Sequence, residues 1–364
     1  MSASRGKETR LKILVALAGP LVMLALIEGA AFLWERGQAN GPYAWELVAS
    51  RRIELVEYPD PAPGYTLMAP GERYEWGGIA VEINALGLRS PETTREKPTG
   101  TLRILNLGDS IAMGWGVAYE ATYGQLIEGA LSAGTGPETR VEVINAGVPG
   151  WNLENELAYL LAEGLAFSPD AVVLDLTLVN DIYGRSALER NPRPAWIEWL
   201  RANTYLYPFL SIQMQWLAAR AEGQDRIPVI DPPTEARSYF PLDPEAEKWD
   251  ELWSLIVEMH LAASGEGVPL ILVMFPLEYQ VVDPDFATTP QEVLLDRAAA
   301  AGIPIIDLLP VFREACAGKP GEACELEDRY LFADVWMHPS VEGHRLTAEA
   351  LLPVLLEILD SAPE

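Results

Sequence analysis

The chain has 364 residues, of which 49% are hydrophobic and 22% are charged, and its formal net charge is −27. This length suits one large domain or two ordinary ones, and the apolar fraction supplies a sizeable core and excludes wholesale disorder. The negative charge argues against a nucleic-acid-binding protein, because such proteins present basic surfaces to phosphates.

The N-terminus combines a basic start with a long apolar segment. Residues 1–12 contain four Lys or Arg residues, and residues 13–34 are apolar apart from Glu28. The whole span is long enough for a transmembrane helix, whereas its part up to Ile27 has the length of a long signal-peptide core. We expect an uncleaved anchor; a cleaved signal sequence and a buried soluble helix are the alternatives. The basic start then places residues 1–12 in the cytoplasm and the following chain outside it, in the periplasm or at the cell surface.

A carboxylate is costly in lipid, so Glu28 is expected to face a partner helix or the membrane interface. The next stretch, residues 35–100, is rich in proline and glycine and contains short apolar runs such as 79–84. This composition indicates a stalk and a small, irregular, β-rich lead-in, and we recognise no chemistry in it.

From about residue 101 to residue 364, short apolar runs alternate with longer amphipathic stretches. The expected strands are 104–107, 141–145, 171–176, 269–275 and 303–306, and the expected helices are 121–133, 153–166, 250–263, 287–301 and 341–359. The alternation predicts a three-layer α/β/α domain with a central parallel sheet. Residues 183–250 interrupt it as an insertion with a Trp- and Tyr-rich part, 196–216. These aromatic residues are expected to pack beneath the insertion, with a substrate cleft or a membrane contact as alternatives.

Four residues suited to acyl transfer stand just after the strands or before the last helix. Ser110 and Gly147 follow the first two strands, Asn180 follows the third, and His338 precedes the last helix. In an open α/β sheet, ligands bind beyond the carboxyl ends of the strands. The sequence therefore predicts that these four residues meet at one edge of the sheet.

Each residue type fits a step of that chemistry. Ser110 is the predicted nucleophile, although a serine at this junction is also typical of a helix cap. His338 would take its proton, and Asp334 would orient the imidazole. The N–H groups of Ser110 and Gly147 and the side-chain amide of Asn180 would stabilise the oxyanion. The other two histidines stand within predicted helices: His260 is expected to be a surface or core residue, and His344 is expected to be structural.

These residues resemble the four sequence blocks of the SGNH/GDSL family of serine hydrolases. The matches are Gly-Asp-Ser at 108–110, Gly147 in Asn-Ala-Gly-Val-Pro-Gly, Asn180 in Val-Asn-Asp, and His338 in Met-His-Pro-Ser. The resemblance covers about residues 102–358, and the lead-in with Leu-Gly-Leu-Arg at 86–89 is similar to membrane-anchored bacterial members. It implies a flavodoxin-like SGNH hydrolase fold and hydrolysis of carboxylic esters through an acyl-serine intermediate. We expect no cofactor, and the sequence lacks metal-ligand spacing.

Two positions depart from the family pattern. Val179 stands where the family usually has glycine before the Asn-Asp pair. The acid and base are usually spaced Asp-x-x-His, whereas Asp334 and His338 are one residue further apart. Either the turn bulges, or a backbone carbonyl or Asp328 takes the place of Asp334.

The two cysteines, Cys316 and Cys324, flank a short loop containing glycine and proline. They are candidates for a disulfide in an oxidising compartment, and two free thiols are the alternative. A metal site is not expected there, because no histidine lies near this pair.

The predicted substrates are O-acyl esters, especially O-acetyl groups on envelope or exported polysaccharide. One alternative is an acyltransferase that moves the acyl group to a sugar hydroxyl. The other is a membrane-tethered, glycan-binding scaffold with an idle Ser110–His338 pair, which the longer Asp334–His338 spacing keeps open. Acylated substrate and membrane are the expected partners, and nucleic acid is not.

Overall fold

A computed structural model describes residues 18–20, 22–34, 55–58, 64–76, 79–136, 138–183, 194–221, 240–317, 330–333 and 337–361. The chain divides into two compact units. The larger one comprises Ile53–Glu75, Ile79–Asn191 and Asp231–Glu364, and the smaller one comprises Met1–Arg52, Trp76–Gly78 and Pro192–Ile230. We describe each unit by itself.

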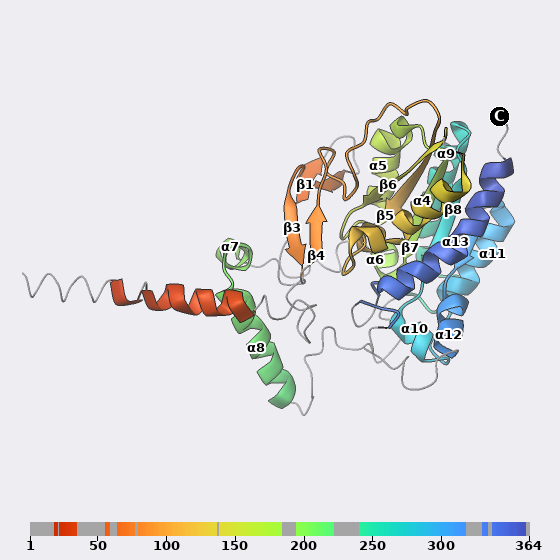
Figure 1. The fold of residues 1–364 in the computed structure, drawn as a ribbon. Helices are drawn as coiled ribbons and strands as arrows, with labels where there is room; N and C mark the ends of the chain where they lie inside the picture. The colour runs from red at the N-terminus through yellow and green to blue at the C-terminus, as the bar shows by residue number, and fades with distance from the viewer. Residues whose placement is uncertain are drawn as a thin grey trace, which may run out of the picture. The chain divides into compact units, whose positions relative to one another are not determined.

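The core of the larger unit is a five-stranded parallel sheet (Figure 1). Its strands are β5 (Thr101–Gly108), β6 (Arg140–Gly147), β7 (Ala171–Thr177), β8 (Leu270–Phe275) and β9 (Ile305–Asp307). Every residue of β7 and β8 is buried, as expected for strands covered on both faces. The order β6-β5-β7-β8-β9 is the flavodoxin-like order, in which the second strand lies outside the first. The predicted fold class is confirmed.

Helices flank this sheet in two groups (Figure 1). The main ones are α4 (Tyr123–Gly134), α5 (Leu153–Tyr159), α9 (Glu247–Gly265), α11 (Thr289–Ala301) and α13 (Val341–Ser361). The first group pairs α4 with α13, and in the second α5 and α11 each pack on α9. Two shorter helices, α10 (Glu278–Val282) and α12 (Leu309–Ala317), were not predicted.

The helix predicted over 153–166 is only partly α-helical. It continues beyond α5 as a π turn (Leu160–Gly164) and a 3₁₀ turn (Leu165–Phe167). A Cβ atom on Gly164 would lie 3.0 Å from Cδ2 of Leu105 in β5. The chain approaches the sheet closely at this point, and sequence periodicity alone does not reveal such a contact.

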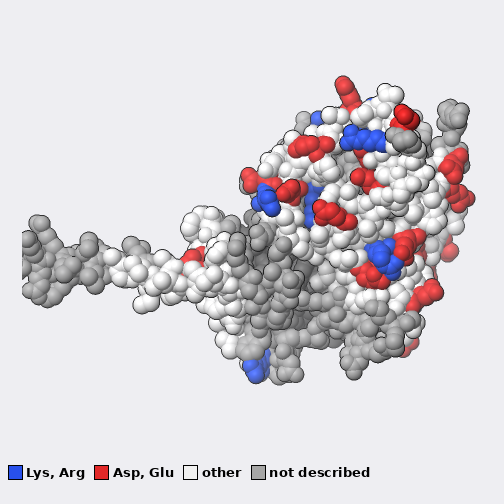
Figure 2. Space-filling view, viewed as in Figure 1, with Lys and Arg blue, Asp and Glu red and all other residues white. Residues whose placement is uncertain are grey.

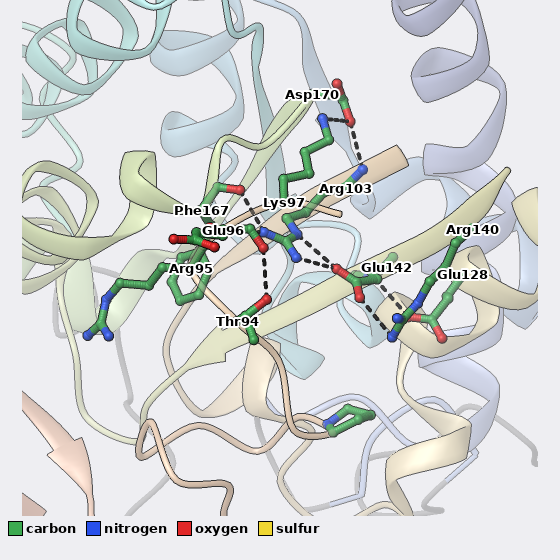
Figure 3. Close-up of polar contacts among 12 residues, drawn as sticks. Thr94, Arg95, Glu96, Lys97, Arg103, Glu128, Arg140, Glu142, Phe167 and Asp170 are labelled. Atoms are coloured by element: carbon green, nitrogen blue, oxygen red, sulfur yellow. Dashed lines mark hydrogen bonds and ion pairs between the residues drawn. The ribbon is translucent and has the colours of Figure 1, made fainter. Parts of the chain in front are cut away.

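A buried ion pair ties the first two strands of the sheet together (Figure 3). Arg103 of β5 and Glu142 of β6 are register partners, and the Arg103 Nη2–Glu142 Oε2 distance is 2.6 Å. Nη1 of Arg103 also donates to the carbonyl of Phe167 at 2.8 Å, and Nη2 of Arg140 lies 2.8 Å from the second Glu142 oxygen. The buried guanidinium therefore has a carboxylate and a carbonyl as partners, which offsets its loss of hydration.

Most of the lead-in, Ile53–Glu75 and the chain from Ile79 onwards, belongs to the larger unit and contains short strands. In one two-stranded sheet β1 (Leu55–Tyr58) pairs antiparallel with β2 (Tyr65–Met68), and in another β3 (Arg73–Trp76) pairs with β4 (Ile79–Glu82). Nε1 of Trp151, which precedes α5, donates to the carbonyl of Thr66 at 2.9 Å. The indole therefore fastens β2 beside the parallel-sheet core.

The smaller unit contains the N-terminal helical segment (residues 18–20 and 22–34), α7 (Ala195–Asn203) and α8 (Leu206–Ala221). Among the described helices, none combines the length and the apolar character needed to cross a membrane. Residues 13–17 and residue 21 of the predicted anchor lie outside the described part of the chain.

Candidate active site

Ser110 stands at the point where β5 passes into a short helix. It is the first residue of α3 (Ser110–Met113), and Asp109 is the N-cap, whose Oδ1 accepts the N–H of Ile111 at 2.8 Å. The helix ends at Gly114, whose φ of +85° is a left-handed conformation that glycine adopts without steric cost. Ser110 thus lies at the carboxyl edge of the sheet, next to the strand-order reversal between β5 and β7, where such folds bind ligands.

His338 meets Ser110 across 228 residues of sequence. Its Nε2 lies 2.8 Å from Oγ of Ser110, a hydrogen-bond distance suited to proton transfer. The main-chain carbonyl of His338 accepts the N–H of Ala333 at 2.7 Å, and Phe332 forms a β-bridge with Pro339. These main-chain contacts hold His338 in a loop just before α13, as its place in the sequence predicts.

The orienting acid predicted from the sequence lies outside the described residues. Asp334 and its alternative, Asp328, both fall in undescribed parts of the chain between 318 and 336. The choice among Asp334, Asp328 and a backbone carbonyl as the group that orients His338 stays a prediction.

Asn180 reaches the same edge of the sheet from the helix that follows β7. It lies in α6 (Leu178–Tyr183), and its side-chain Nδ2 donates to Oδ2 of Asp109. An amide nitrogen carries two hydrogens, so this contact leaves one N–H for a further acceptor. Asp109 therefore both caps α3 and positions the predicted oxyanion donor.

Gly147 ends β6 directly opposite Gly108 in the strand register. A Cβ atom at Gly147 would lie 2.2 Å from the backbone nitrogen of Met113, so only glycine lets α3 pack this close to β6. The N–H of Gly147 donates to Oδ1 of Asn145 at 3.0 Å, and Nδ2 of Asn145 donates to the carbonyl of Ala112 at 2.7 Å. Gly147 thus has a packing role that sequence reasoning missed, and its N–H already has an acceptor in this conformation.

A group of buried carboxyl groups lies beneath the site. Burial raises the pKa of Asp109, and it raises the pKa values of Asp175, Asp181 and Glu156 well above the usual range. The hydroxyl of Tyr123 contacts Asp175, and Oδ2 of Asp181 accepts the N–H of Thr177 at 2.7 Å. Burial disfavours the charged form of each of these acids, because the protein interior solvates a carboxylate poorly.

His344 is structural, as predicted. It is fully buried in α13, its Nδ1 accepts the N–H of Tyr123 at 3.3 Å, and its ring stacks on the Tyr123 ring at a centroid distance of 5.8 Å. Burial lowers the pKa of His344 to about 3, so the ring is neutral at physiological pH. His260 is half-buried on α9.

Two residues that support the site were not identified from the sequence. The ring of Trp115 stacks on that of His338, with centroids 5.9 Å apart. Arg89, from the lead-in, is 1% exposed, and its guanidinium donates to the carbonyls of Met113, Gly114 and Val117 at 3.1, 2.7 and 2.9 Å. It thereby fixes the chain that leaves α3. The sequence feature that could have pointed to Arg89 is its position at the end of a short apolar run.

The described residues contain no cluster of three or more His, Cys, Asp or Glu side chains able to hold a metal ion. The expected independence from cofactors stays a prediction. Cys316, in α12, is not a free cysteine. Its predicted partner, Cys324, is among the undescribed residues, so the pairing also stays a prediction.

The sequence matches the model of the GDSL-like lipase/acylhydrolase family over residues 107–346. No functionally curated sequence matches the chain.

Similar solved structures include a putative lipolytic G-D-S-L protein from Desulfitobacterium hafniense, with 16% identity, coverage of 69% of this chain and 98% of that chain, and a TM-score of 0.39. The acetyl xylan esterase AlAXEase has 16% identity, coverage of 70% and 100%, and a TM-score of 0.42. A variant of Axe2, an acetyl-xylooligosaccharide esterase from Geobacillus stearothermophilus, has 19% identity, coverage of 71% and 95%, and a TM-score of 0.41.

The family match spans well over half of the chain and includes Ser110, Gly147, Asn180 and His338. It agrees with the resemblance deduced from the four sequence blocks and with the flavodoxin-like strand order. The chain therefore belongs to the GDSL-like lipase/acylhydrolase family, and it is a serine hydrolase that acts on ester bonds.

Proposed function

We propose that the enzyme cleaves carboxylic esters through an acyl-Ser110 intermediate, with His338 as the base. The observation that carries this proposal is the 2.8 Å distance between Nε2 of His338 and Oγ of Ser110 at the carboxyl edge of the sheet. A nucleophile within hydrogen-bond reach of a base is the arrangement that acyl transfer requires.

In the first step, Oγ of Ser110 attacks the ester carbonyl carbon while Nε2 of His338 takes the hydroxyl proton. The carbonyl oxygen becomes an oxyanion, which accepts hydrogen bonds from the Ser110 N–H and the free N–H of the Asn180 amide. Gly147 contributes a third donor if its N–H turns away from Asn145. His338 then gives its proton to the departing alcohol, and water, deprotonated by the same nitrogen, releases the acid.

The proposed substrates are short O-acyl esters, in particular O-acetyl groups on polysaccharide outside the cytoplasm. Ser110 is only 7% exposed and His338 only 6%, which favours a small acyl group over a long chain at the reacting atoms. The extracytoplasmic location is inferred from the basic start and apolar stretch of residues 1–34. Asp334 is the proposed orienting acid.

The test is esterase activity of the full-length protein in mild detergent on p-nitrophenyl acetate, butyrate and octanoate. We expect the highest turnover on acetate, and Ser110→Ala and His338→Ala should each lower kcat by at least about 1,000-fold. His260→Ala is the matched histidine control and should retain activity. Turnover that survives in Ser110→Ala would refute the nucleophile.

A second assay distinguishes ester hydrolysis from acyl transfer, and a pair of variants tests which aspartate orients His338. Acetylated oligosaccharide should yield free acetate, whereas acetylation of an added sugar acceptor would favour an acyltransferase. Asp334→Asn should lower kcat much more than Asp328→Asn. The reverse result would assign the orienting role to Asp328.

A further inference from the structure

The smaller unit carries an apolar surface that its own packing leaves uncovered. On α8, Leu210, Met214 and Leu217 are 50%, 65% and 55% exposed. Their spacing of four and three residues places them on one face of the helix. On α7, Trp196 and Trp199 are exposed in the same way. Most of the exposed large apolar side chains among the described residues belong to this unit.

The N-terminal helical segment is joined to the beginning of α8. The carboxylate of Glu28 accepts the backbone N–H of Tyr205 and, at 3.0 Å, that of Leu206. Two edge-to-face ring pairs lie beside this contact, each with centroids 5.0 Å apart: Phe32 with Tyr205, and Trp34 with Phe209. Glu28 thus uses both oxygens on the N–H groups at the positive end of α8, where a negative charge is stabilised.

The charge of these helices differs from that of the chain as a whole. Residues 194–221 contain one acidic residue, Glu198, and two arginines, in a chain of net charge −27. Few charged side chains are visible on the described surface of this unit in Figure 2. An anionic bilayer repels carboxylates, and tryptophan and tyrosine prefer its interface. The composition therefore fits a lipid surface better than an aqueous one.

We propose that the N-terminal helical segment, α7 and α8 form one membrane-seated unit, with α7 and α8 lying in the interface of a phospholipid bilayer. The 16 residues of α8 extend about 24 Å at 1.5 Å per residue, which is shorter than the hydrocarbon core of about 30 Å. An orientation along the surface lets Leu210, Met214 and Leu217 enter the acyl-chain boundary. This inference builds on the membrane anchor expected for the N-terminal segment and extends the membrane contact to a second part of the chain.

The test places fluorescent NBD reporters on single introduced cysteines of the full-length protein in phosphatidylcholine/phosphatidylglycerol vesicles. Unmodified protein labelled in parallel corrects for the native cysteines. Met214→Cys reports on α8, and Leu261→Cys on α9 of the larger unit is the matched control, because the two side chains are 65% and 64% exposed. Lipids brominated on their acyl chains should quench the Met214 reporter at least three-fold more than the Leu261 reporter. Iodide in the water should show the opposite preference.

A third reporter, Met23→Cys, separates the two proposals. Lipid quenching at position 23 but not at position 214 would overturn the present inference and leave the N-terminal attachment intact, whereas no quenching at either position would overturn both. Protection of position 214 from both quenchers, together with chemical cross-linking into dimers, would assign the surface to a second copy of this chain and also overturn the inference.

Substitution of Glu28 tests the link between the N-terminal helical segment and α8. Glu28→Leu removes both acceptors, so quenching at position 214 should fall about two-fold or more while quenching at position 23 persists. Glu28→Gln keeps one oxygen acceptor and should give an intermediate value. If the N-terminal segment alone attached the protein to the bilayer, Glu28→Leu would not lower lipid quenching at position 214, because this substitution makes the segment more apolar. Unchanged or stronger lipid quenching at position 214 would refute the proposed role of Glu28.

Discussion

Trp115 stacks on the imidazole of His338, with the ring centroids 5.9 Å apart and the ring planes inclined by 28°. In the proposed mechanism the imidazole becomes positively charged when it takes the proton of Ser110, and an indole face stabilises a nearby cation by about 1–2 kcal/mol. Trp115→Ala should therefore lower kcat about 5- to 30-fold, whereas Trp115→Phe should keep most of the activity. Steady-state kinetics on p-nitrophenyl acetate would measure both, and an unchanged kcat in Trp115→Ala would rule out this role.

Asp109 should affect activity through Asn180 rather than through the substrate. In Asp109→Asn the side-chain oxygen can still accept the N–H of Ile111. The new NH₂ group then faces the Asn180 NH₂ group, so Asn180 loses the acceptor that positions its side chain. We expect kcat to fall by roughly 100-fold, the scale of losing an oxyanion donor, with a small change in KM. Asn180→Ala should give a similar loss, and the double variant should add little to either. Additive losses would show that the two residues act separately.

His344 should make the protein less stable as the pH falls. Its folded-state pKa of about 3 lies below the ordinary value of 6.5, so the unfolded chain binds a proton that the folded chain excludes. Below pH 6.5, this histidine alone should lower the free energy of unfolding by about 1.4 kcal/mol per pH unit. His344→Asn, which retains an acceptor for the N–H of Tyr123, should lack that contribution. Urea unfolding between pH 7 and 5 gives the comparison, and parallel pH profiles would contradict it.

Removing one partner of the Arg103–Glu142 ion pair should lower the free energy of unfolding more than replacing both partners by apolar residues. Arg103→Met leaves the Glu142 carboxylate with only the more exposed Arg140, and we expect a loss of about 3–5 kcal/mol in the free energy of unfolding. The double variant Arg103→Met with Glu142→Leu should recover a substantial part, because no charge is then left without its main partner. Chemical denaturation of the single and double variants measures this coupling. A double variant less stable than Arg103→Met would disprove it.

The fold and the Ser110–His338 contact followed from local sequence patterns. Strands such as β7 and β8 are unbroken apolar runs, and the carboxyl ends of parallel strands share one edge of the sheet, so their flanking residues meet. His338 was distinguishable from His344 because the following Pro339 keeps it out of a helix, whereas His344 lies within α13.

Other contacts join residues that the fold brings together from distant parts of the chain, and the periodicity of the sequence does not predict them. The sequence gives no sign that a Cβ at Gly147 would strike Met113, or that the N–H of Gly147 finds Asn145. Trp115 follows α3 as one aromatic residue among many, and its partner lies more than two hundred positions away. α10 was missed because a helix of five residues carries little periodicity.

The contacts of Arg89 bear on where the enzyme can be shortened. This arginine lies 18 residues before the first position matched by the family model, yet its three hydrogen bonds define the path of the chain just after Ser110. A protein cut at the family boundary would expose those three carbonyls in the wall beside Ser110. The smallest fragment that retains esterase activity therefore has to begin upstream of Arg89. Part of the lead-in, although outside the family match, is needed to hold the chain beside Ser110 in place.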